Sequence, residues 1–530
     1  MQMLNQSKAK QKGVALIIFA LLFALAATAF LISGLDGTSL NKERQKRTAF
    51  ALADAKAALI GYALKSGILT GADRPGDLPC PDTNHDGSSE TSCPGNAIGR
   101  LPWRTLGLAD LRDEYDESLW YAVSANYKKN PKIGKLNSAT NGTISLRDST
   151  GTIIRNGTTA TAAIAVVISP GNPLTRQDGV VQNRIVANYD NALHYLDNFD
   201  SVDNSKDEDN SGFVETSTNG FISGLIKDAS NAVVLNDSII AINYGDLMPL
   251  LEKRVANEVK KRLTDLGGLP LAVPFTNPST LNNNFAPVKA TNQGLLPVNP
   301  HYWFSIDSNP SYITYSGNVN FSDVKSGFLE PGFCEQSGSQ IVCSGRKKMM
   351  LGATAFWRNI SINIDGILNA ANSFPNSNMV GSLTINDVRI SDGITIGAGA
   401  ITPTPTTKIS ISPTISTNFP VWLTTNDWHH EIYYAVANSF VYSASYPPVC
   451  GSCLSVNYNG GVIANVGAIT LVAGRKLSST LYQPITPQYP PSANLYDYYD
   501  TFNNQASGVT YDWNRVLSKT FNDQLVVITQ

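Results

Sequence analysis

An uninterrupted apolar segment near the N-terminus constrains this chain more than any other feature. Residues 14–32 read VALIIFALLFALAATAFLI and carry no charged side chain. As a helix, this segment spans roughly 28 Å, about the thickness of the hydrocarbon core of a membrane. Lys8, Lys10 and Lys12 precede it without any acidic residue. Because basic flanks stay in the cytoplasm, the segment predicts a single membrane span, with residues 1–13 inside the cell and the rest exported.

A second helical pattern continues directly from the apolar segment. Residues 39–66 contain no proline and are rich in alanine, leucine and lysine. Phe50, Ala53, Ala57 and Ile60 recur at three- and four-residue spacing, which predicts the apolar face of an amphipathic helix. The two segments together predict one helix of about 50 residues and roughly 75 Å. An anchor helix followed by a separate stalk helix is the alternative, and an ordinary cleaved signal peptide is a third interpretation.

This region resembles the start of type IV pilin-like proteins. Lys10-Gln11-Lys12-Gly13 followed by VALII is similar to the leader and mature N-terminus of that family, and RTAFALADAKAAL is similar to the continuation of its helix. The resemblance covers residues 8–65. It implies that a prepilin peptidase cleaves after Gly13 and that Val14 becomes a methylated N-terminus. It further implies an inner-membrane protein with its bulk in the periplasm, whose partners are other pilin-like subunits.

One position departs from the family pattern. The family usually carries Glu at the fifth mature position, where this chain has Ile18. That glutamate is thought to pair with the N-terminal amine of a neighbouring subunit, and a buried ammonium without a partner is costly. The GVALI form is similar to certain minor pilins and to the large minor pseudopilin of type II secretion. The resemblance therefore implies a tip or low-copy subunit that primes, caps or decorates a type IV pilus or a type II secretion filament, where it lies at the cell surface or outside the cell after assembly.

Composition and motifs narrow the class of protein further. The chain has 530 residues, of which only 15% are charged, and its formal net charge is −2. We therefore expect no nucleic-acid partner, because nucleic-acid binding relies on a basic surface. The sequence has no GxSxG, HExxH, P-loop or GxGxxG motif, so we expect no enzymatic activity. A pilus-tip adhesin or ligand-binding protein, and a signal-anchored periplasmic enzyme, are the alternatives.

The cysteines agree with an exported chain. All six lie beyond the apolar segment, as the local pairs Cys80/Cys93, Cys334/Cys343 and Cys450/Cys453. An even number in a translocated chain predicts three disulfides. The last pair has the spacing of a redox motif, but Pro447 and Pro448 precede it and a strand-like pattern follows it. We therefore expect a structural disulfide there.

Residues 99–242 and 420–528 share five landmarks in the same order, which predicts two copies of one α+β module. The clearest landmark is AVVISPGNPL at 165–174, which aligns without gaps on AITLVAGRKL at 468–477. The other four pair Pro102-Trp103 with Pro420-Val421-Trp422, Leu119–Val123 with Ile432–Val436, residues 194–200 with 495–500, and Leu235–Ile240 with Phe521–Val526.

The fold class predicted for the whole chain is α+β, with the two modules flanking a β-rich middle domain. The middle domain is indicated by alternating strand patterns in an Asn-, Ser- and Thr-rich region that ends in TPTPTT. The predicted order is a leader at 1–13, a transmembrane segment at 14–35, an amphipathic continuation at 36–66, the first module at 67–268, the middle domain with its linker at 269–408, and the second module at 409–530.

An amphipathic helix is predicted over residues 249–265. Its apolar side chains recur every four residues and are Leu251, Val255, Val259 and Leu263. This pattern favours packing against the first module over contact with a membrane or a partner protein.

Two acidic loops have the pattern of calcium-binding loops, with oxygen-bearing side chains at alternate positions before a glycine. The residues concerned are Asp82, Asn84 and Asp86 in the first loop, and Asp207, Asp209 and Ser211 in the second. Neither loop has an acidic residue at the twelfth position. Calcium is the only cofactor that the sequence indicates, and an acidic Asx-turn loop without an ion is the alternative.

His429, His430 and Glu431 form the remaining group with ligand chemistry. Consecutive residues do not face one metal ion on a helix, so a zinc site here would need distant partners. We therefore expect these histidines to be structural.

Overall fold

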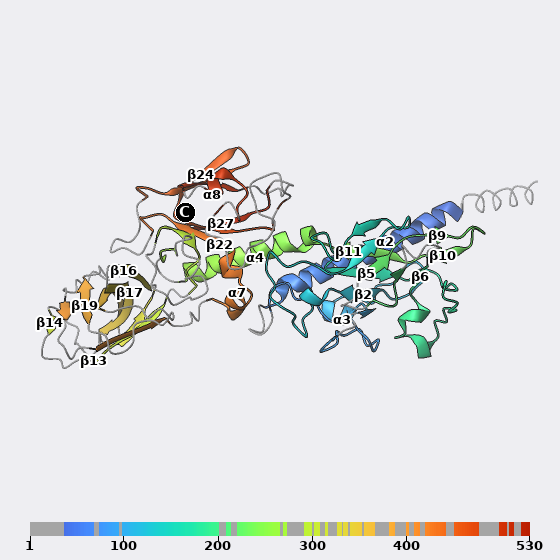
Figure 1. Ribbon diagram of the computed structural model, residues 1–530, viewed down its shortest axis with the longest axis horizontal. Helices are drawn as coiled ribbons and strands as arrows, with labels where there is room; N and C mark the ends of the chain where they lie inside the picture. The colour runs from blue at the N-terminus through green and yellow to red at the C-terminus, as the bar shows by residue number, and fades with distance from the viewer. Residues whose placement is uncertain are drawn as a thin grey trace, which may run out of the picture. The chain divides into compact units, whose positions relative to one another are not determined.

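The computed structural model is a mixed α+β protein with several small sheets, which confirms the α+β class (Figure 1). The residues it describes are 37–67, 74–94, 98–200, 208–213, 220–265, 269–272, 291–298, 301–307, 313–315, 326–330, 332–337, 340–351, 354–365, 381–386, 399–401, 408–413, 419–440, 450–475, 477, 495, 498–505, 508–513 and 521–529.

These residues form two compact units whose segments alternate along the sequence. Unit 1 comprises the described parts of residues 1–59, 79–124 and 143–242. Unit 2 comprises the described parts of residues 60–78, 125–142 and 243–530.

Helix α2 (Gly37–Lys65) occupies the region predicted as the amphipathic continuation. Its buried face differs from the predicted one, because Phe50, Ala53 and Ala57 are exposed and Ile60 is half-buried. The buried apolar residues are Ala51, Leu52, Ala55, Leu59 and Ala63. An alanine-rich helix carries apolar side chains on several faces, so spacing alone does not select the face that packs. Packing against the globular part makes that selection.

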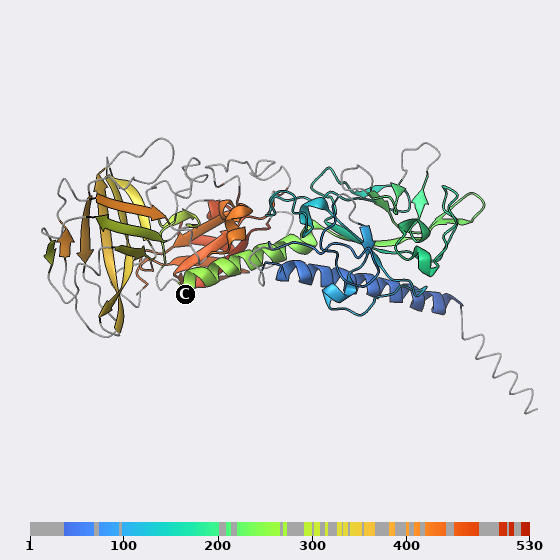
Figure 2. The ribbon, with the colours of Figure 1, turned by 90° about the horizontal axis from the view of Figure 1, so that it is seen from below.

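A four-stranded antiparallel sheet, sheet 1, forms the centre of unit 1. Its strands, in spatial order, are β1 (Ile98–Arg100), β2 (Trp120–Val123), β5 (Ala165–Ser169) and β11 (Ser238–Ile242). Helix α2 runs along this sheet (Figures 1 and 2), and Lys56 Nζ donates to the carbonyl of Ala241 in β11 at 3.0 Å. A core that includes Trp120, Tyr195 and Phe221 forms within the unit. Sheet 1 is therefore a packed layer with an α-helix along it.

Shorter elements complete unit 1. They are α3 (Trp103–Leu106), the sheet of β4 (Ile153–Arg155), β3 (Ser145–Arg147) and β8 (Gly220–Ile222), the pair β6 (Asn198–Phe199) and β7 (Glu208–Asp209), and the hairpin β9 (Ile226–Lys227) and β10 (Val233–Leu235).

Unit 2 contains a second four-stranded antiparallel sheet, sheet 2. Its strands, in spatial order, are β12 (Gln293–Leu295), β22 (Ile432–Val436), β25 (Ala468–Val472) and β27 (Gln524–Thr529). Helix α4 (Tyr244–Thr264) packs on β25 and β27. It begins earlier than predicted, after a capping box between Asn243 and Asp246. The predicted apolar positions of α4 are buried. The helix packs on sheet 2, and Leu251 also lies against Gly76, within the predicted first module.

The two sheets share strand order, strand direction and register. Tyr121 in β2 pairs with Val167 in β5, and the sequence-matched Tyr434 in β22 pairs with Thr470 in β25. The last strands also pair at matched positions. The landmarks that recur in the sequence therefore occupy corresponding places in the two sheets.

The first strand of sheet 2 comes from the region that the sequence assigned to the middle domain. Gly294 in β12 lies opposite Tyr434, as Gly99 in β1 lies opposite Tyr121. Strand β12 is only three residues long, so it carries no periodic signal and was not identified as part of the second module. Helix α7 (Val421–Thr425) then follows, at the position that α3 has in unit 1.

The middle region is β-rich, and it is inserted between β12 and β22. One sheet has the order β15 (Ser326–Leu329), β13 (Tyr302–Asp307) and β21 (Lys408–Pro413). The other has the order β14 (Ile313–Tyr315), β20 (Gly399–Ile401), β19 (Gly381–Asn386), β18 (Thr354–Asp365), β17 (Gln340–Leu351) and β16 (Gly332–Ser337). Strand β21 extends this region beyond its predicted end at residue 408, and TPTPTT at 402–407 lies outside the described residues.

The C-terminal part of unit 2 adds one further sheet and a short helix. They are β24 (Gly461–Val466), β23 (Leu454–Tyr458) and β26 (Thr510–Trp513), with α8 (Phe502–Gln505).

Candidate functional site

The predicted processing and assembly residues, Gly13, Val14 and Ile18, lie outside the described residues, as does the apolar segment 14–32. Within the described part of the chain, no helix combines the length and the apolar character needed to cross a membrane. Leader cleavage, methylation and membrane anchoring therefore stay predictions.

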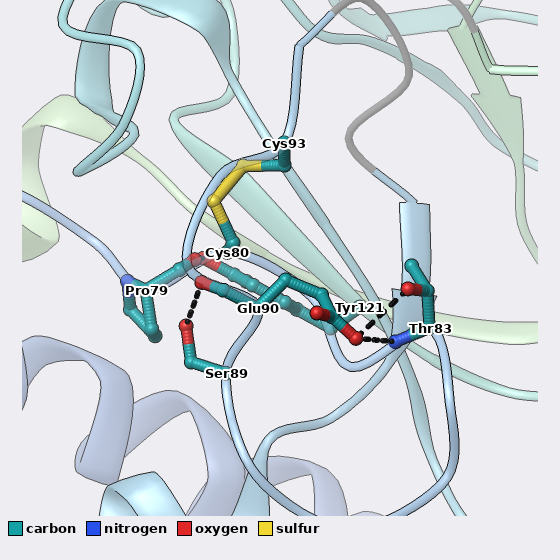
Figure 3. Close-up of a disulfide and its surroundings, with 7 residues drawn as sticks. All are labelled: Pro79, Cys80, Thr83, Ser89, Glu90, Cys93 and Tyr121. Carbon is teal, nitrogen blue, oxygen red and sulfur yellow. Dashed lines mark hydrogen bonds between the residues drawn. A yellow bond between two sulfur atoms is a disulfide. The ribbon is translucent and has the colours of Figure 1, made fainter.

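All three predicted cysteine pairs are disulfides. Cys80 and Cys93 have a Cα–Cα distance of 5.7 Å and close the first acidic loop (Figure 3). Cys334 and Cys343 lie directly opposite each other in β16 and β17. The third pair, Cys450–Cys453, precedes β23 as a local cross-link. Each disulfide ties together residues that are close in sequence.

The first acidic loop is built from a series of side-chain to backbone hydrogen bonds. Asp82 is buried, and its two carboxylate oxygens accept from the N–H groups of Asn84 at 3.1 Å and Gly87 at 2.7 Å. Asn84 Oδ1 accepts from the N–H of Asp86 at 3.0 Å, and Asp86 Oδ1 accepts from that of Ser88 at 2.6 Å. The hydrogen bond from Ser88 is the main cause that lowers the pKa of Asp86. These are Asx turns, which order the loop by itself, and calcium binding at this loop stays a prediction.

Two further contacts close the same loop. Glu90 accepts hydrogen bonds from the backbone and the hydroxyl of Thr83, the latter at 2.9 Å (Figure 3). Gly87 has a φ of +81°, and a Cβ atom there would lie 2.5 Å from the ring of Trp103. Among the described residues, no group of three or more His, Cys, Asp or Glu side chains is arranged to hold a metal ion.

In the second acidic loop, the side chain of Arg176 supplies the positive charge that pairs with the acidic residues. The buried guanidinium of Arg176 donates to Asp209 Oδ1 at 3.0 Å and to Ser211 Oγ at 2.9 Å. It also forms an ion pair with Asp178 at 2.9 Å. Asp207 lies outside the described residues. Arg176 is 33 positions away from Asp209, so the spacing within the loop did not reveal it.

Unit 1 contains a buried pair of carboxyl groups at the start of β11. The N–H of Asn236 donates to Asp197 Oδ2 at 2.7 Å, and Gln182 Nε2 donates to Asp197 Oδ1 at 2.8 Å. The N–H of Asp197 in turn donates to Asp237 Oδ2 at 2.8 Å. Burial raises the pKa of Asp197 to about 6, and burial followed by the charge of Asp197 raises the pKa of Asp237 well above its usual range. Both shifts favour the protonated form of the pair in the folded chain.

Unit 2 has a similar arrangement before β27, where Asn522 and Asp523 match Asn236 and Asp237 in sequence. The N–H of Asn522 donates to Asp500 Oδ2 at 2.7 Å, and the N–H of Asp500 donates to Asp523 Oδ2 at 3.0 Å. Burial and then the neighbouring Asp500 raise the pKa of Asp523 well above its usual range. The repeated Asn-Asp landmark of the sequence is therefore the turn that holds this pair.

Two further acids are buried in unit 2. Glu252 of α4 accepts a hydrogen bond from the Tyr244 hydroxyl at 3.0 Å, and Glu431 accepts one from the N–H of Ser138 at 3.1 Å. Burial raises the pKa of Glu431 to about 8 and that of Glu252 well above its usual range. Both groups therefore favour the protonated form in the folded chain.

The adjacent histidines are buried, and their ring centroids are 3.9 Å apart. Burial, and then the neighbouring His430, lower the pKa of His429 to about 3. A neutral ring in the core agrees with the structural role expected for His429.

The acids Asp197, Asp237, Glu252 and Glu431 are buried and hydrogen-bonded within their units. The first acidic loop is hydrogen-bonded as well, but its Asn84 and Asp86 side chains are exposed. Sequence comparison adds no family to this description. No protein-family model matches the chain, and no curated protein or solved structure shows significant similarity to it.

Proposed function

We propose that this chain is a membrane-anchored minor pilin-like or pseudopilin-like subunit that primes, caps or decorates a type IV pilus or a type II secretion filament. One relationship supports the proposal above all. The apolar segment 14–32 leads in sequence into α2, and α2 runs along an antiparallel sheet to which Lys56 is hydrogen-bonded. In the sequence, a basic leader and an apolar segment come before the helix α2 that lies along an antiparallel sheet.

The fold supports a finer proposal, that the exported part is a tandem of two related modules. Helix α2 precedes β1 and packs in unit 1, and helix α4 precedes β12 and packs on sheet 2. In this proposal, α4 is the counterpart of α2, but no apolar segment comes before it. One membrane anchor therefore serves two modules, and the second module carries the inserted β-rich region.

The proposed mechanism is lateral packing of apolar helices. Residues 14–35 would hold the subunit in the inner membrane and then exchange lipid contacts for contacts with the helices of other pilin-like subunits. Ile18 offers no carboxylate to the amine of a neighbour, which favours a tip or low-copy position. The large exported modules restrict where such a subunit fits.

Intact-mass and N-terminal analysis of the full chain from cell membranes tests this function. We expect a mature protein that begins with N-methylated Val14, and we expect Gly13→Ala to abolish cleavage. Gly34→Ala, on the other side of the apolar segment, is the matched control and should be processed normally. A mature N-terminus near residue 30 would instead indicate ordinary signal cleavage and would contradict the proposal.

A tip adhesin is the second candidate, and the position of the middle region favours it. Residues 302–413 are inserted between β12 and β22, and the four strands of sheet 2 pair without them. Deletion of residues 299–418 with a short linker keeps β12 and α7. An adhesin would then lose attachment while filaments persist, whereas an assembly subunit that needs this region would lose the filaments.

A further inference from the structure

Unit 1 has a hollow between the N-terminal half of α2 and the loops at the edge of sheet 1. Its volume is about 660 Å³, within the range of roughly 300–1,000 Å³ that is typical of ligand pockets. Helix α2 forms one side, and the loops before β2 and after β5 form others together with the β9–β10 hairpin. A hollow of this size accepts a small organic molecule.

Hydrogen bonds within the protein hold the walls of this hollow. The buried carboxylate of Asp113 accepts from the N–H of Tyr115 at 2.8 Å and from the N–H of Gly171 at 3.2 Å, so it joins two of the lining loops. Thr48 Oγ1 of α2 accepts from the N–H of Glu114 at 3.0 Å and joins the helix to the same loop. The hollow is therefore formed before any ligand binds, as is usual for ligand pockets.

Two opposite charges line the hollow, Arg44 from α2 and Glu114 from the loop before β2. Within the described part of the chain, neither side chain forms an ion pair or a hydrogen bond. Burial, and then the charge of Asp113, raise the pKa of Glu114, whereas Arg44 lowers it without reversing the shift. A cation in contact with this carboxylate would therefore stabilise its charged form.

The remaining lining supplies an aromatic ring and apolar side chains. Tyr115 is 45% exposed and lines the hollow next to Glu114 in sequence. An aromatic ring and a carboxylate together suit an ammonium group, which both attract. Leu225 and Val233 line the hollow from the hairpin, and they are 60% and 39% exposed. The hollow thus combines a place for a cation, a place for an anion and accessible apolar surface.

We propose that this hollow binds a short peptide with free termini and apolar side chains, with its ammonium group at Glu114 and its carboxylate at Arg44. A zwitterion satisfies both charged groups, whereas a ligand with one charge would meet a group of its own sign. The apolar side chains of the peptide would contact Leu225 and Val233, and both partners would then leave water.

This inference goes beyond the proposed function. The hollow is lined by unit 1 alone, and its chemistry depends neither on leader cleavage nor on a filament. A Gly13→Ala chain should therefore bind the peptide as the unchanged chain does. Loss of the pilin-like assignment and loss of the peptide site are separate results.

Calorimetric titration of the purified full chain in detergent micelles with L-leucyl-L-leucine tests the site. We expect this dipeptide to bind. N-acetylation removes its ammonium charge and amidation removes its carboxylate charge, and each change should weaken binding about fivefold or more. These two modified peptides test the two charges one at a time.

Substitutions then assign each charge to its partner. In Glu114→Gln, the free and the acetylated peptide should bind equally, because the contact with the ammonium group is already lost. In Arg44→Gln, the free and the amidated peptide should bind equally. Glu43→Gln and Lys42→Gln are the matched controls, since both residues are exposed on α2 but do not line the hollow. Both controls should keep the full discrimination.

A blocking variant locates the bound peptide. Ala49 is exposed and lines the hollow, so Ala49→Trp should reduce binding by filling part of it. Ala53→Trp is the matched control, because Ala53 is exposed on the same helix and does not line the hollow.

Four outcomes would overturn the inference. The dipeptide does not bind, or a peptide blocked at both ends binds as well as the free one. Binding that is unchanged in Ala49→Trp would place the peptide elsewhere on the chain. Tighter binding of glycerophosphoethanolamine, a zwitterion without apolar side chains, would mean that the hollow recognises a lipid headgroup instead of a peptide.

Discussion

The backbone N–H of Asp197 donates to Oδ2 of Asp237 at 2.8 Å, and the two carboxyl groups are buried together. In unit 2 the backbone N–H of Asp500 donates to Oδ2 of Asp523 at 3.0 Å, with Asp523 buried and Asp500 half-buried. In both units the pair lies where the chain enters the last strand of the four-stranded sheet. The repeated pair makes the stability of each sheet sensitive to the protonation of buried acids.

The first prediction concerns pH. The pKa of Asp197 rises from 3.8 to about 6 on folding. An acid with a higher pKa in the folded state than in the unfolded state holds its proton more tightly when the chain is folded. It therefore stabilises the fold at pH values below its unfolded pKa, and this stabilisation is lost as the pH rises through its folded pKa. We expect unit 1 to lose on the order of 2–3 kcal/mol of stability between about pH 4 and pH 6.

The stability of unit 1 can be measured at several pH values between about 4 and 7. At each pH, the chain is pulse-labelled by hydrogen exchange across a urea series, and the peptides from β11 report the unfolding of this unit. Asp237→Asn should flatten the dependence on pH, because only one ionisable group then remains in the pair. Asp54→Asn, at an exposed position on α2, is the control. An unchanged dependence in Asp237→Asn would contradict the assignment to this pair.

The second prediction concerns Gly87. Its φ of +81° favours glycine, and a Cβ atom would overlap the ring of Trp103. We expect Gly87→Ala to destabilise unit 1 by about 2 kcal/mol or more and to increase hydrogen exchange in residues 82–90. Gly107→Ala is the matched control, since Gly107 also has a positive φ, of +72°, but has no atom within 4 Å of the added Cβ. Equal effects of the two substitutions would exclude the contact with Trp103 as the cause.

The third prediction concerns Arg176. Its buried guanidinium joins Asp178, Asp209 and the carbonyl of Leu196. Arg176→Met should cost about 2–3 kcal/mol, because these acceptors lose a charged donor in a buried site. Thermal unfolding of the full chain measures the loss, and Lys227→Met, at an exposed position in the same unit, should change the midpoint little. A neutral result for Arg176→Met would mean that the acceptors are satisfied by water.

The fourth prediction concerns calcium at the first acidic loop. The oxygens of Asp82 accept the N–H groups of the loop itself, so we expect calcium and chelator to leave hydrogen exchange of residues 82–90 unchanged. Titration of the purified chain with calcium, monitored by the same peptides, provides the measurement. Protection that appears with calcium and disappears in Asp86→Asn would support a calcium loop after all.

Elements with local or strongly polarised signals were predicted well. The apolar positions of α4 stand among lysines and arginines, so only one face of that helix was available for burial. The cysteine pairs are separated by 13, 9 and 3 positions, so proximity in sequence identified their partners. The paired landmarks identified corresponding strands because both copies bury them in the same register.

Features that depend on distant contacts were not predicted. Phe50 was placed on the packed face of α2, yet Ala51 and Leu52 are buried and Phe50 is exposed. Strand β12 was not recognised, because its identity as a strand comes from pairing with β22. Arg176 carries no motif, and only the fold brings it to Asp209.

The amino-acid sequence by itself determined the apolar N-terminal segment, the disulfide partners, the duplicated landmarks and the face of α4, because each is encoded in neighbouring residues or in a repeated pattern. Only the tertiary structure decided which face of α2 is exposed, that Arg176 pairs with the second acidic loop, and that β12 supplies the first strand of sheet 2. Each of these is set by contacts between segments far apart in the chain, and burial in a packed interior is a property of the assembled fold.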